Sequence, residues 1–209
     1  MVDTQLLAAT SNSGKIREIS QILEGIEPTL VYLSDIPTIP AEPEETGTTF
    51  AENAQLKARY YAQLSQMPTI ADDSGLSVLE LDGFPGVQSA RWTTGEDTAR
   101  VQALLGLLEK AGLTEPVQRR AFFSCVVSFA RPDQENTIEF EGVCWGTLAH
   151  VPLGQTGFGY DPLFIPDGES MTMAQLGSPV KNKISARAGA LAKFKLWLQQ
   201  HDTTNQPRK

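Results

Sequence analysis

The sequence predicts an α/β protein, because segments with strand and helix patterns alternate along one chain. Residues 4–10 form a short apolar run that predicts a buried strand, and Ile16, Ile19, Ile22 and Leu23 follow it at helical spacing. Residues 120–130 and 137–148 are rich in Phe, Val and Cys, and the sequence PDQEN between them predicts a turn. This second pattern is typical of an antiparallel hairpin.

The next elements lie before the middle of the chain. Residues 29–33 predict a second short strand, and the polar, proline-bearing residues 35–47 predict a loop. A helix is expected over residues 50–63, with an apolar face at a period of 3.6 residues. Thr49 and Glu52 stand three positions apart at its start, which is the pattern of a capping box.

The middle of the chain combines an apolar strand with a run of turn-forming residues. Pro68 opens a strand that leads into ADDSG, and residues 76–79 predict a further strand after it. Taken alone, Asp-Asp-Ser-Gly is the sequence of a turn. Residues 81–92 predict a loop that carries Arg91, and a helix capped by Thr94 follows and ends at Gly112.

The last third of the chain holds two unusual stretches. Residues 154–166, GQTGFGYDPLFIP, contain three glycines and two aromatic residues before the first proline, and glycines let backbone approach a ligand closely. Residues 178–200 predict a C-terminal helix. Lys181, Lys183 and Arg187 lie near its start, where positive charge opposes the helix dipole, and an anionic ligand would remove that conflict.

Composition limits the classes of function. Hydrophobic residues make up 41% and charged residues 20% of 209, with a net charge of −8. That charge has the wrong sign for non-specific binding to nucleic acid or anionic membranes. We find no apolar run of about 18 residues, the length of a membrane span, and no secretory signal. We therefore expect one cytoplasmic domain over residues 1–200 and a disordered tail over 201–209. Cys125 and Cys144 lack zinc-site spacing and are interpreted as buried thiols.

Three patterns suggest chemistry, and each has a plainer alternative. Asp72 and Asp73 are oxygen ligands of the kind that a hard divalent cation prefers, or simply part of a turn. SNSG and Lys15 follow a strand and open a helix, which is an anion site or only a connection, and the sequence is not a Walker P-loop. Phe158 and Tyr160 are suited to stack on a purine or to fill the core.

Five blocks of the sequence, in this order, resemble the noncanonical purine nucleoside triphosphate pyrophosphatases, the inosine/xanthosine triphosphatase family. The resemblance spans residues 6–198, and five blocks in the same order are specific where one would not be. The blocks are ATSNSGK (9–15), EETGTTFAENAQLKA (44–58), ADDSGLSVLELDGFPGVQSARW (71–92), GFGYDPLF (157–164) and KNKISARAGAL (181–191).

The resemblance implies an elongated mixed sheet with flanking helices, two lobes around a central cleft, and a homodimer. It implies hydrolysis of inosine, deoxyinosine and xanthosine triphosphates to the monophosphate and pyrophosphate, with Mg²⁺ as cofactor, which removes these nucleotides from the pool. Asp73 would accept a proton, and Glu44 and Asp73 would bind magnesium. The substrate-binding residues implied are Thr10, Ser11, Asn12, Ser13, Gly14, Lys15, Ser74, Phe158, Gly159, Tyr160, Asp161, Lys181 and Arg187.

The two acidic residues are expected to differ in role. Adjacent strand residues point to opposite faces, so we assign the metal and the attacking water to Asp73. Asp72 then shapes the field beside it or joins the outer shell of the metal. Lys15 and Lys181 are expected to hold the leaving pyrophosphate.

One position departs from the family pattern. The family usually has Ser-His-Arg where this chain has Ser185, Ala186 and Arg187. We carry no role onto Ala186, and we expect weaker discrimination between bases than in a relative with histidine. The alternatives are a pyrophosphatase for other modified nucleotides, a catalytically silent nucleotide-binding regulator, and a structural protein without a ligand.

Overall fold

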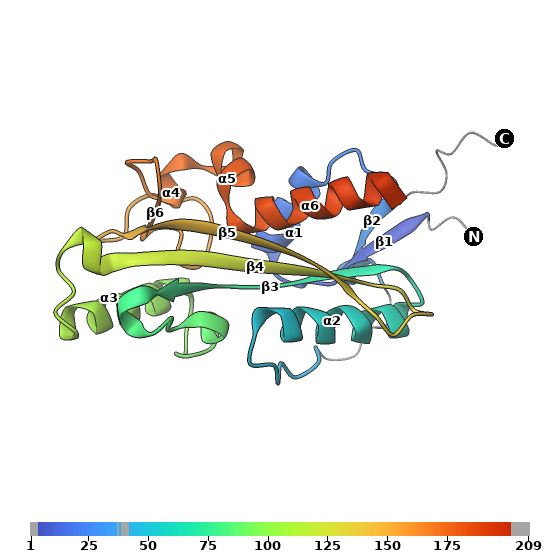
Figure 1. Cartoon of the computed structure of the whole chain (residues 1–209), viewed down its shortest axis with the longest axis horizontal. Helices are drawn as coiled ribbons and strands as arrows, with labels where there is room; N and C mark the ends of the chain where they lie inside the picture. The colour runs from blue at the N-terminus through green and yellow to red at the C-terminus, as the bar shows by residue number, and fades with distance from the viewer. Residues whose placement is uncertain (1–3, 37, 39–41, 202–209) are drawn as a thin grey trace. The chain divides into compact units, whose positions relative to one another are not determined.

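The computed structural model describes residues 4–36, 38 and 42–201, and it confirms the α/β class (Figure 1). Six strands form one sheet in the order β2-β1-β3-β4-β5-β6. β1 pairs in parallel with β2 and β3, whereas β5 pairs antiparallel with β6, so the sheet is mixed as expected. The strands are β1 (Gln5–Ala8), β2 (Thr29–Tyr32), β3 (Thr69–Val78), β4 (Arg120–Ala130), β5 (Ile138–Leu148) and β6 (Phe164–Pro166).

The predicted hairpin is confirmed, since β4 and β5 are neighbours in the sheet and only residues 131–137 join them. A connection this short excludes a parallel crossover, which takes a dozen or more residues. Cys125 and Cys144 lie in these two strands as free, buried thiols, also as expected. Burial raises the pKa of the Cys144 thiol to about 11, so the thiol stays protonated at neutral pH.

The helices begin near the predicted starts, with one exception. Thr49 and Glu52 form the expected capping box of α2. α3 begins later than predicted, because Glu96 rather than Thr94 occupies its N-cap. The helices are α1 (Ser13–Ile22), α2 (Phe50–Ser65), α3 (Asp97–Lys110), α4 (Met173–Leu176), α5 (Ser178–Ile184) and α6 (Ala186–His201), with short 3₁₀ turns at Leu33–Asp35, Leu79–Leu81, Gly86–Gln88 and Pro116–Arg119.

Two sequence interpretations are wrong in an instructive way. The turn alternative for DDSG is excluded, because β3 runs through it from Thr69 to Val78 with almost every residue buried, so the strand expected over residues 76–79 is the continuation of β3 rather than a separate strand. The expected C-terminal helix is two helices, separated at Ser185, whose ψ of 157° is extended. Lys181 and Lys183 therefore lie in the last turn of α5, where a positive charge suits the helix dipole.

The chain divides into two compact units. Unit 1 comprises residues 1–73, 126–141 and 189–209, and unit 2 comprises residues 74–125 and 142–188. Two predictions fall on residues that the structure leaves out in whole or in part. Residues 37 and 39–41 of the expected loop lie outside the described residues, as does the expected tail beyond His201.

In unit 1, helices α2 and α6 cover opposite faces of the sheet (Figure 1). On the α2 side, buried Tyr61 belongs to one apolar cluster with Ala71 and Ala130 of the strands and with Ala9, which follows β1. On the α6 side, the Phe194 ring lies 5.9 Å from that of Phe129. These two layers fix the position of β3, which carries Asp72 and Asp73.

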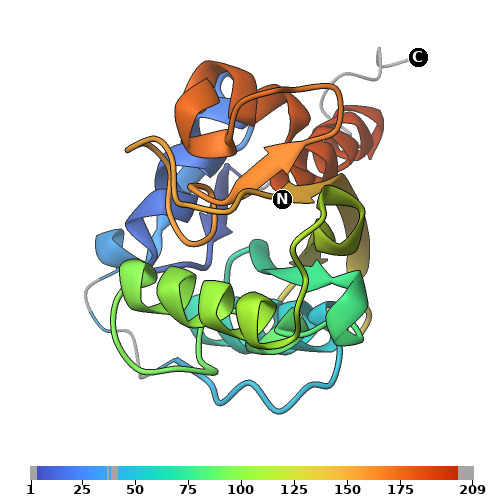
Figure 2. The same ribbon diagram turned by 90° about the vertical axis from the view of Figure 1, so that its left-hand side faces the viewer.

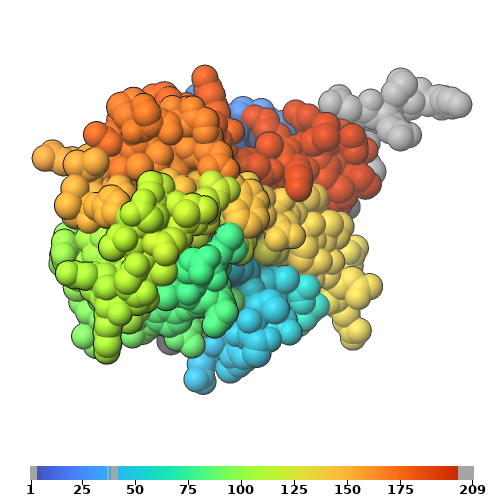
Figure 3. All heavy atoms as spheres, turned by 60° about the vertical axis from the view of Figure 1, so that its left-hand side comes forward, coloured from blue at the N-terminus to red at the C-terminus, as the bar shows by residue number. Residues whose placement is uncertain are grey.

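In unit 2, α3 lies on one side of the strands and α4 and α5 lie on the other (Figures 1 and 2). Leu104 and Leu108 of α3 are fully buried, as are Leu163 and Phe164 at the start of β6. In the space-filling view, the orange segment after β5 borders the yellow-green segment that holds α3 (Figure 3). None of the described helices is long and apolar enough to cross a membrane.

Candidate active site

The turn between β1 and α1 is closed by its own side chains. The Asn12 carboxamide oxygen caps α1 by accepting hydrogen bonds from the amides of Gly14 (2.9 Å) and Lys15 (3.1 Å). Thr10 Oγ1 accepts from the Asn12 amide at 3.2 Å. Ser11 and Ser13 are exposed. The turn thus presents hydroxyl groups at a helix start, which is suited to an anion.

Lys15 reaches from this turn to β3. Its ammonium lies 3.1 Å from the Asp72 carboxylate and 3.3 Å from the Asp72 carbonyl oxygen. Asp72 is 5% exposed. The pair fixes the amine of Lys15 by charge and a hydrogen bond together, so Asp72 positions a lysine.

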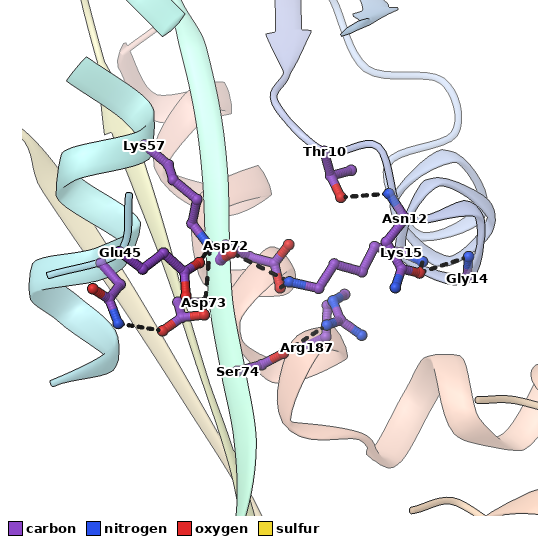
Figure 4. Close-up of polar contacts among 11 residues, drawn as sticks. Thr10, Asn12, Gly14, Lys15, Glu45, Lys57, Asp72, Asp73, Ser74 and Arg187 are labelled. Atoms are coloured by element: carbon purple, nitrogen blue, oxygen red, sulfur yellow. Dashed lines mark hydrogen bonds and ion pairs between the residues drawn. The ribbon is translucent and has the colours of Figure 1, made fainter. Parts of the chain in front are cut away.

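Asp73 points to the opposite side of β3 from Asp72 (Figure 4). Its Oδ2 accepts a hydrogen bond from Asn53 Nδ2 at 3.1 Å, and its Oδ1 lies 3.4 Å from the Lys57 ammonium. Lys57 also lies 2.5 Å from Glu45 Oε1. We call Lys15, Glu45, Lys57, Asp72 and Asp73 the charged cluster of unit 1.

Burial and charge set the protonation of this cluster. Burial raises the pKa of the Asp73 carboxyl above its ordinary value, and the positive charge of Lys57 only partly opposes it. Burial acts to lower the pKa of Lys57, but Asp73, Asp72 and Glu45 outweigh it, and the pKa is raised. A buried carboxylate beside a charged lysine is a typical environment for a general base.

Three residues around Asp73 were not predicted as site residues from the sequence: Glu45, Asn53 and Lys57. Asn53 and Lys57 stand four positions apart on α2, and both are buried. The lysine on an otherwise apolar helix face was the available signal. Glu44, the predicted metal ligand, is exposed, and its neighbour Glu45 is the carboxylate near Asp73.

The donor set of this cluster fits a hard cation. In the part of the chain that the structure describes, no group of three His, Cys, Asp or Glu side chains is arranged around one metal position. Magnesium needs fewer protein ligands, since it binds one or two carboxylates and keeps waters or substrate phosphates. The contact of Asp73 Oδ1 with Lys57 is long, at 3.4 Å, which suits an oxygen that takes another partner.

Unit 2 gathers cations around an aromatic ring. The ammonium of Lys181 lies 4.3 Å from the centre of the Phe158 ring, and the Arg187 guanidinium carbon lies 5.5 Å from it. Arg187 donates to Ser74 Oγ at 2.9 Å (Figure 4), and Lys181 is ion-paired with Asp161. We call Phe158, Asp161, Lys181 and Arg187, with Ser74, the ring cluster of unit 2.

The predicted site residues of the glycine loop differ in exposure. Phe158 and Gly159 are partly exposed, whereas Tyr160 is 3% exposed. The Tyr160 hydroxyl donates to the Ser89 carbonyl oxygen at 2.8 Å and accepts from Trp92 Nε1 at 2.7 Å. Phe158 is therefore the more exposed of the two aromatic residues in this loop.

Comparison with known proteins identifies the fold. A HAM1 protein from Coxiella burnetii superposes with a TM-score of 0.82 at 35% identity, over 94% of this chain and 98% of that one. The Staphylococcus aureus Ham1 protein gives a TM-score of 0.79 at 37% identity, with the same coverage. The fold is thus that of the Ham1 proteins.

Sequence relatives extend the comparison. A Streptomyces avermitilis protein named dITP/XTP pyrophosphatase is 45% identical over 191 residues, which are 90% of this chain and 93% of that protein. A Geobacter sulfurreducens protein of the same name is 44% identical over 194 residues, 92% of this chain and 95% of the other. The Ham1 family profile matches residues 6–197. This chain belongs to the Ham1 family.

Proposed function

We propose that this chain hydrolyses noncanonical purine nucleoside triphosphates, those of inosine, deoxyinosine and xanthosine, to the monophosphate and pyrophosphate. The observation that supports this most is the buried Asp73 carboxylate, held by Asn53 and Lys57 and raised in pKa. A carboxylate with a raised pKa is a stronger base than an ordinary one, which suits it to take a proton from water. The names of the two bacterial relatives point to the same reaction.

In the proposed step, a water attacks the α-phosphorus. Its proton goes to Asp73, the bond from the α-phosphorus to the bridging oxygen breaks, and pyrophosphate leaves with the electron pair. Lys57 keeps Asp73 ionised before the attack, and Asn53 fixes the direction of the carboxylate. Little covalent chemistry falls to the protein, whose work is to orient the water and stabilise charge.

The phosphate groups are assigned to the start of α1. Thr10, Ser11 and Ser13 supply hydroxyl groups, Asn12 and Gly14 close the turn that presents them, and Lys15, held by Asp72, supplies a positive charge. We assign Mg²⁺ to Asp73 and Glu44, and Glu45 stands beside them as a further carboxylate. When bound, the cation neutralises charge on the triphosphate. The remaining charge stabilisation falls to Lys15.

The base is assigned to the ring cluster. Phe158 stacks on the purine, and Lys181 and Arg187 lie close enough to its ring to donate hydrogen bonds to the edge of a stacked base. Hypoxanthine and xanthine present an acceptor at position 6, where adenine presents a donor. A donor aimed at that oxygen disfavours ATP, because two donors would then face each other. Ser74, Gly159, Tyr160 and Asp161 complete the proposed substrate-binding set.

Two further proposals follow from the family. The chain forms a homodimer, which light scattering on the purified protein tests, and it acts in the cytoplasm, where the nucleotide pool lies. A monomer at micromolar concentration would contradict the first. Export of the tagged protein from the cell would contradict the second.

The function is tested by pyrophosphate release from inosine, xanthosine, guanosine and adenosine triphosphates, each with Mg²⁺ and with EDTA. Inosine and xanthosine triphosphates are expected to react fastest, and EDTA is expected to stop all four reactions. Binding of these nucleotides without any release of pyrophosphate would instead indicate a regulator. Equal rates for all four would contradict the assignment of the ring cluster to base recognition.

A further inference from the structure

The loop that carries Phe158 has little intrinsic order. Gly157 and Gly159, on either side of Phe158, have φ angles of +81° and +61°, a region that glycine enters freely. A Cβ at Gly157 would collide with the Asp161 carboxylate, so the close approach there requires glycine. The glycines therefore do not fix the position of the Phe158 ring, and we look for the side-chain contacts that hold this loop in place.

Two of these contacts hold backbone amides. Asp161 Oδ2 accepts a hydrogen bond from the Phe158 amide at 2.8 Å, within the loop. Asp97, the first residue of α3, accepts from the Gly159 amide at 2.6 Å. The second bond ties the loop to a segment 62 residues earlier in the sequence.

The third contact is a chain of hydrogen bonds from half-buried Trp92 through buried Tyr160 and Ser89. Trp92 Nε1 donates to Tyr160 Oη at 2.7 Å, and Tyr160 Oη donates to the Ser89 carbonyl oxygen at 2.8 Å. The Ser89 hydroxyl accepts from the Leu76 amide of β3 at 2.9 Å and donates to the Gly86 carbonyl oxygen at 2.6 Å. The chain thus ends on the backbone of a strand.

We propose that Trp92 is a positioning residue for base recognition, acting through Tyr160 on the placement of Phe158. This inference rests on the proposed function. The Trp92 indole N–H reaches the loop through Tyr160, and the indole ring also packs on Phe84 at 5.0 Å between ring centres. Removing its one hydrogen bond loosens the loop while the packing stays.

The test is a double-mutant cycle with Trp92→Phe and Tyr160→Phe. Each variant keeps an aromatic ring and loses one partner of the Trp92–Tyr160 bond. We expect KM for inosine triphosphate to rise about 3- to 10-fold in each, with kcat within about twofold, because binding of the base is weakened equally in the ground state and the transition state. We expect the double variant to be no worse than the worse single variant.

A matched control is Trp145→Phe, the same substitution in unit 2 at a side chain that is 43% exposed. Its KM should equal that of the natural chain. Additive effects of the two changes in the cycle, or a fall in kcat with unchanged KM, would overturn the proposal.

Hydrogen exchange supplies a readout that does not depend on activity. Trp92→Phe should speed exchange at the amides of residues 157–161, whereas Trp145→Phe should not. Unchanged exchange there overturns the proposal even if the natural chain hydrolyses none of the tested nucleotides, a result that would separately refute the proposed function. Thermal unfolding midpoints, measured for all variants, separate loosening of the loop from loss of the whole fold.

Discussion

The charged cluster of unit 1 and the ring cluster of unit 2 are held in different ways. Asp72 and Asp73 stand on β3, a buried strand, and each faces a lysine from a helix or a helix start. Phe158 stands on a glycine loop, which hydrogen bonds to its backbone hold in place. The groups that we propose to move protons and bind phosphate thus lie on regular elements as paired charges, whereas the ring that we propose for the base lies on a loop held by hydrogen bonds.

This difference predicts unequal costs of substitution. In the charged cluster, removing one member takes an ion-pair partner from a buried or half-buried charge, which is destabilising. In the ring cluster, removing the ring forfeits stacking and leaves the remaining ion pair, Lys181 with Asp161, intact. Substitutions in the charged cluster are therefore expected to have larger effects than substitutions in the ring cluster.

The largest effect is expected for Asp73→Asn. Loss of the general base should lower kcat about 10³-fold or more, with pyrophosphate release as the assay. Binding of inosine monophosphate, measured by calorimetry, should persist because the ring cluster is untouched. Near-normal turnover in this variant would refute the role of Asp73.

Lys57→Met should cost stability more than substrate binding. It leaves Glu45 and Asp73 without the ammonium that lies between them, so the free energy of unfolding should fall by about 3 kcal/mol. Denaturation by urea measures this. The double variant Lys57→Met/Asp73→Asn should recover part of the loss, and failure to recover any would show that Lys57 stabilises by packing alone.

Phe158→Ala should weaken nucleotide affinity by about 1–3 kcal/mol, the value of a base stacked on an aromatic ring. Its effect on kcat at saturating substrate should be much smaller. Phe158→Leu keeps apolar bulk without an aromatic face, so its nucleotide affinity should lie between those of the natural chain and of Phe158→Ala. An unchanged KM in Phe158→Ala would remove Phe158 from the base site.

A smaller effect concerns pH in the metal-free protein. Because the pKa of Asp73 is raised on folding, the native state holds this proton to higher pH than the unfolded chain does. The free energy of unfolding should therefore fall as pH rises from the ordinary carboxyl pKa of 3.8 through the raised native value. Asp73→Asn should lack this fall, and identical pH profiles for the two proteins would contradict the raised pKa.

The smallest effect is expected for Ala186→His, which restores the usual Ser-His-Arg sequence at residues 185–187. The preference for inosine over guanosine triphosphate, as a ratio of kcat/KM, should rise by about threefold, the value of roughly one modest hydrogen bond. Equal ratios for the natural chain and the variant would show that Ala186 has no bearing on base choice.

Local sequence signals predicted the capping box of α2 and strands β4 and β5, because both depend on neighbours in the chain. They misjudged DDSG. The turn preferences of Asp, Ser and Gly are weaker than the sheet partners that extend β3 through them. They also missed a break at Ser185, which divides the expected helix without a glycine or proline at that position.

The sequence predicted which kinds of residue form the site better than it predicted their contacts. The opposite orientation of Asp72 and Asp73 follows from the pleat of a strand and needed no further information. The burial of Lys57 depends on how α2 packs against β3, a contact between residues 16 positions apart. The ion pair of Lys181 with Asp161 and the contact of Lys181 with the Phe158 ring likewise depend on tertiary structure. The sequence could therefore suggest a cation there but not its partners.

The most direct test of the account is hydrolysis of inosine triphosphate in water labelled with oxygen-18, followed by mass spectrometry of both products. Attack on the α-phosphorus by a water that Asp73 deprotonates predicts one labelled oxygen in inosine monophosphate and none in pyrophosphate. Label in pyrophosphate, or release of orthophosphate in its place, would contradict the proposed chemistry.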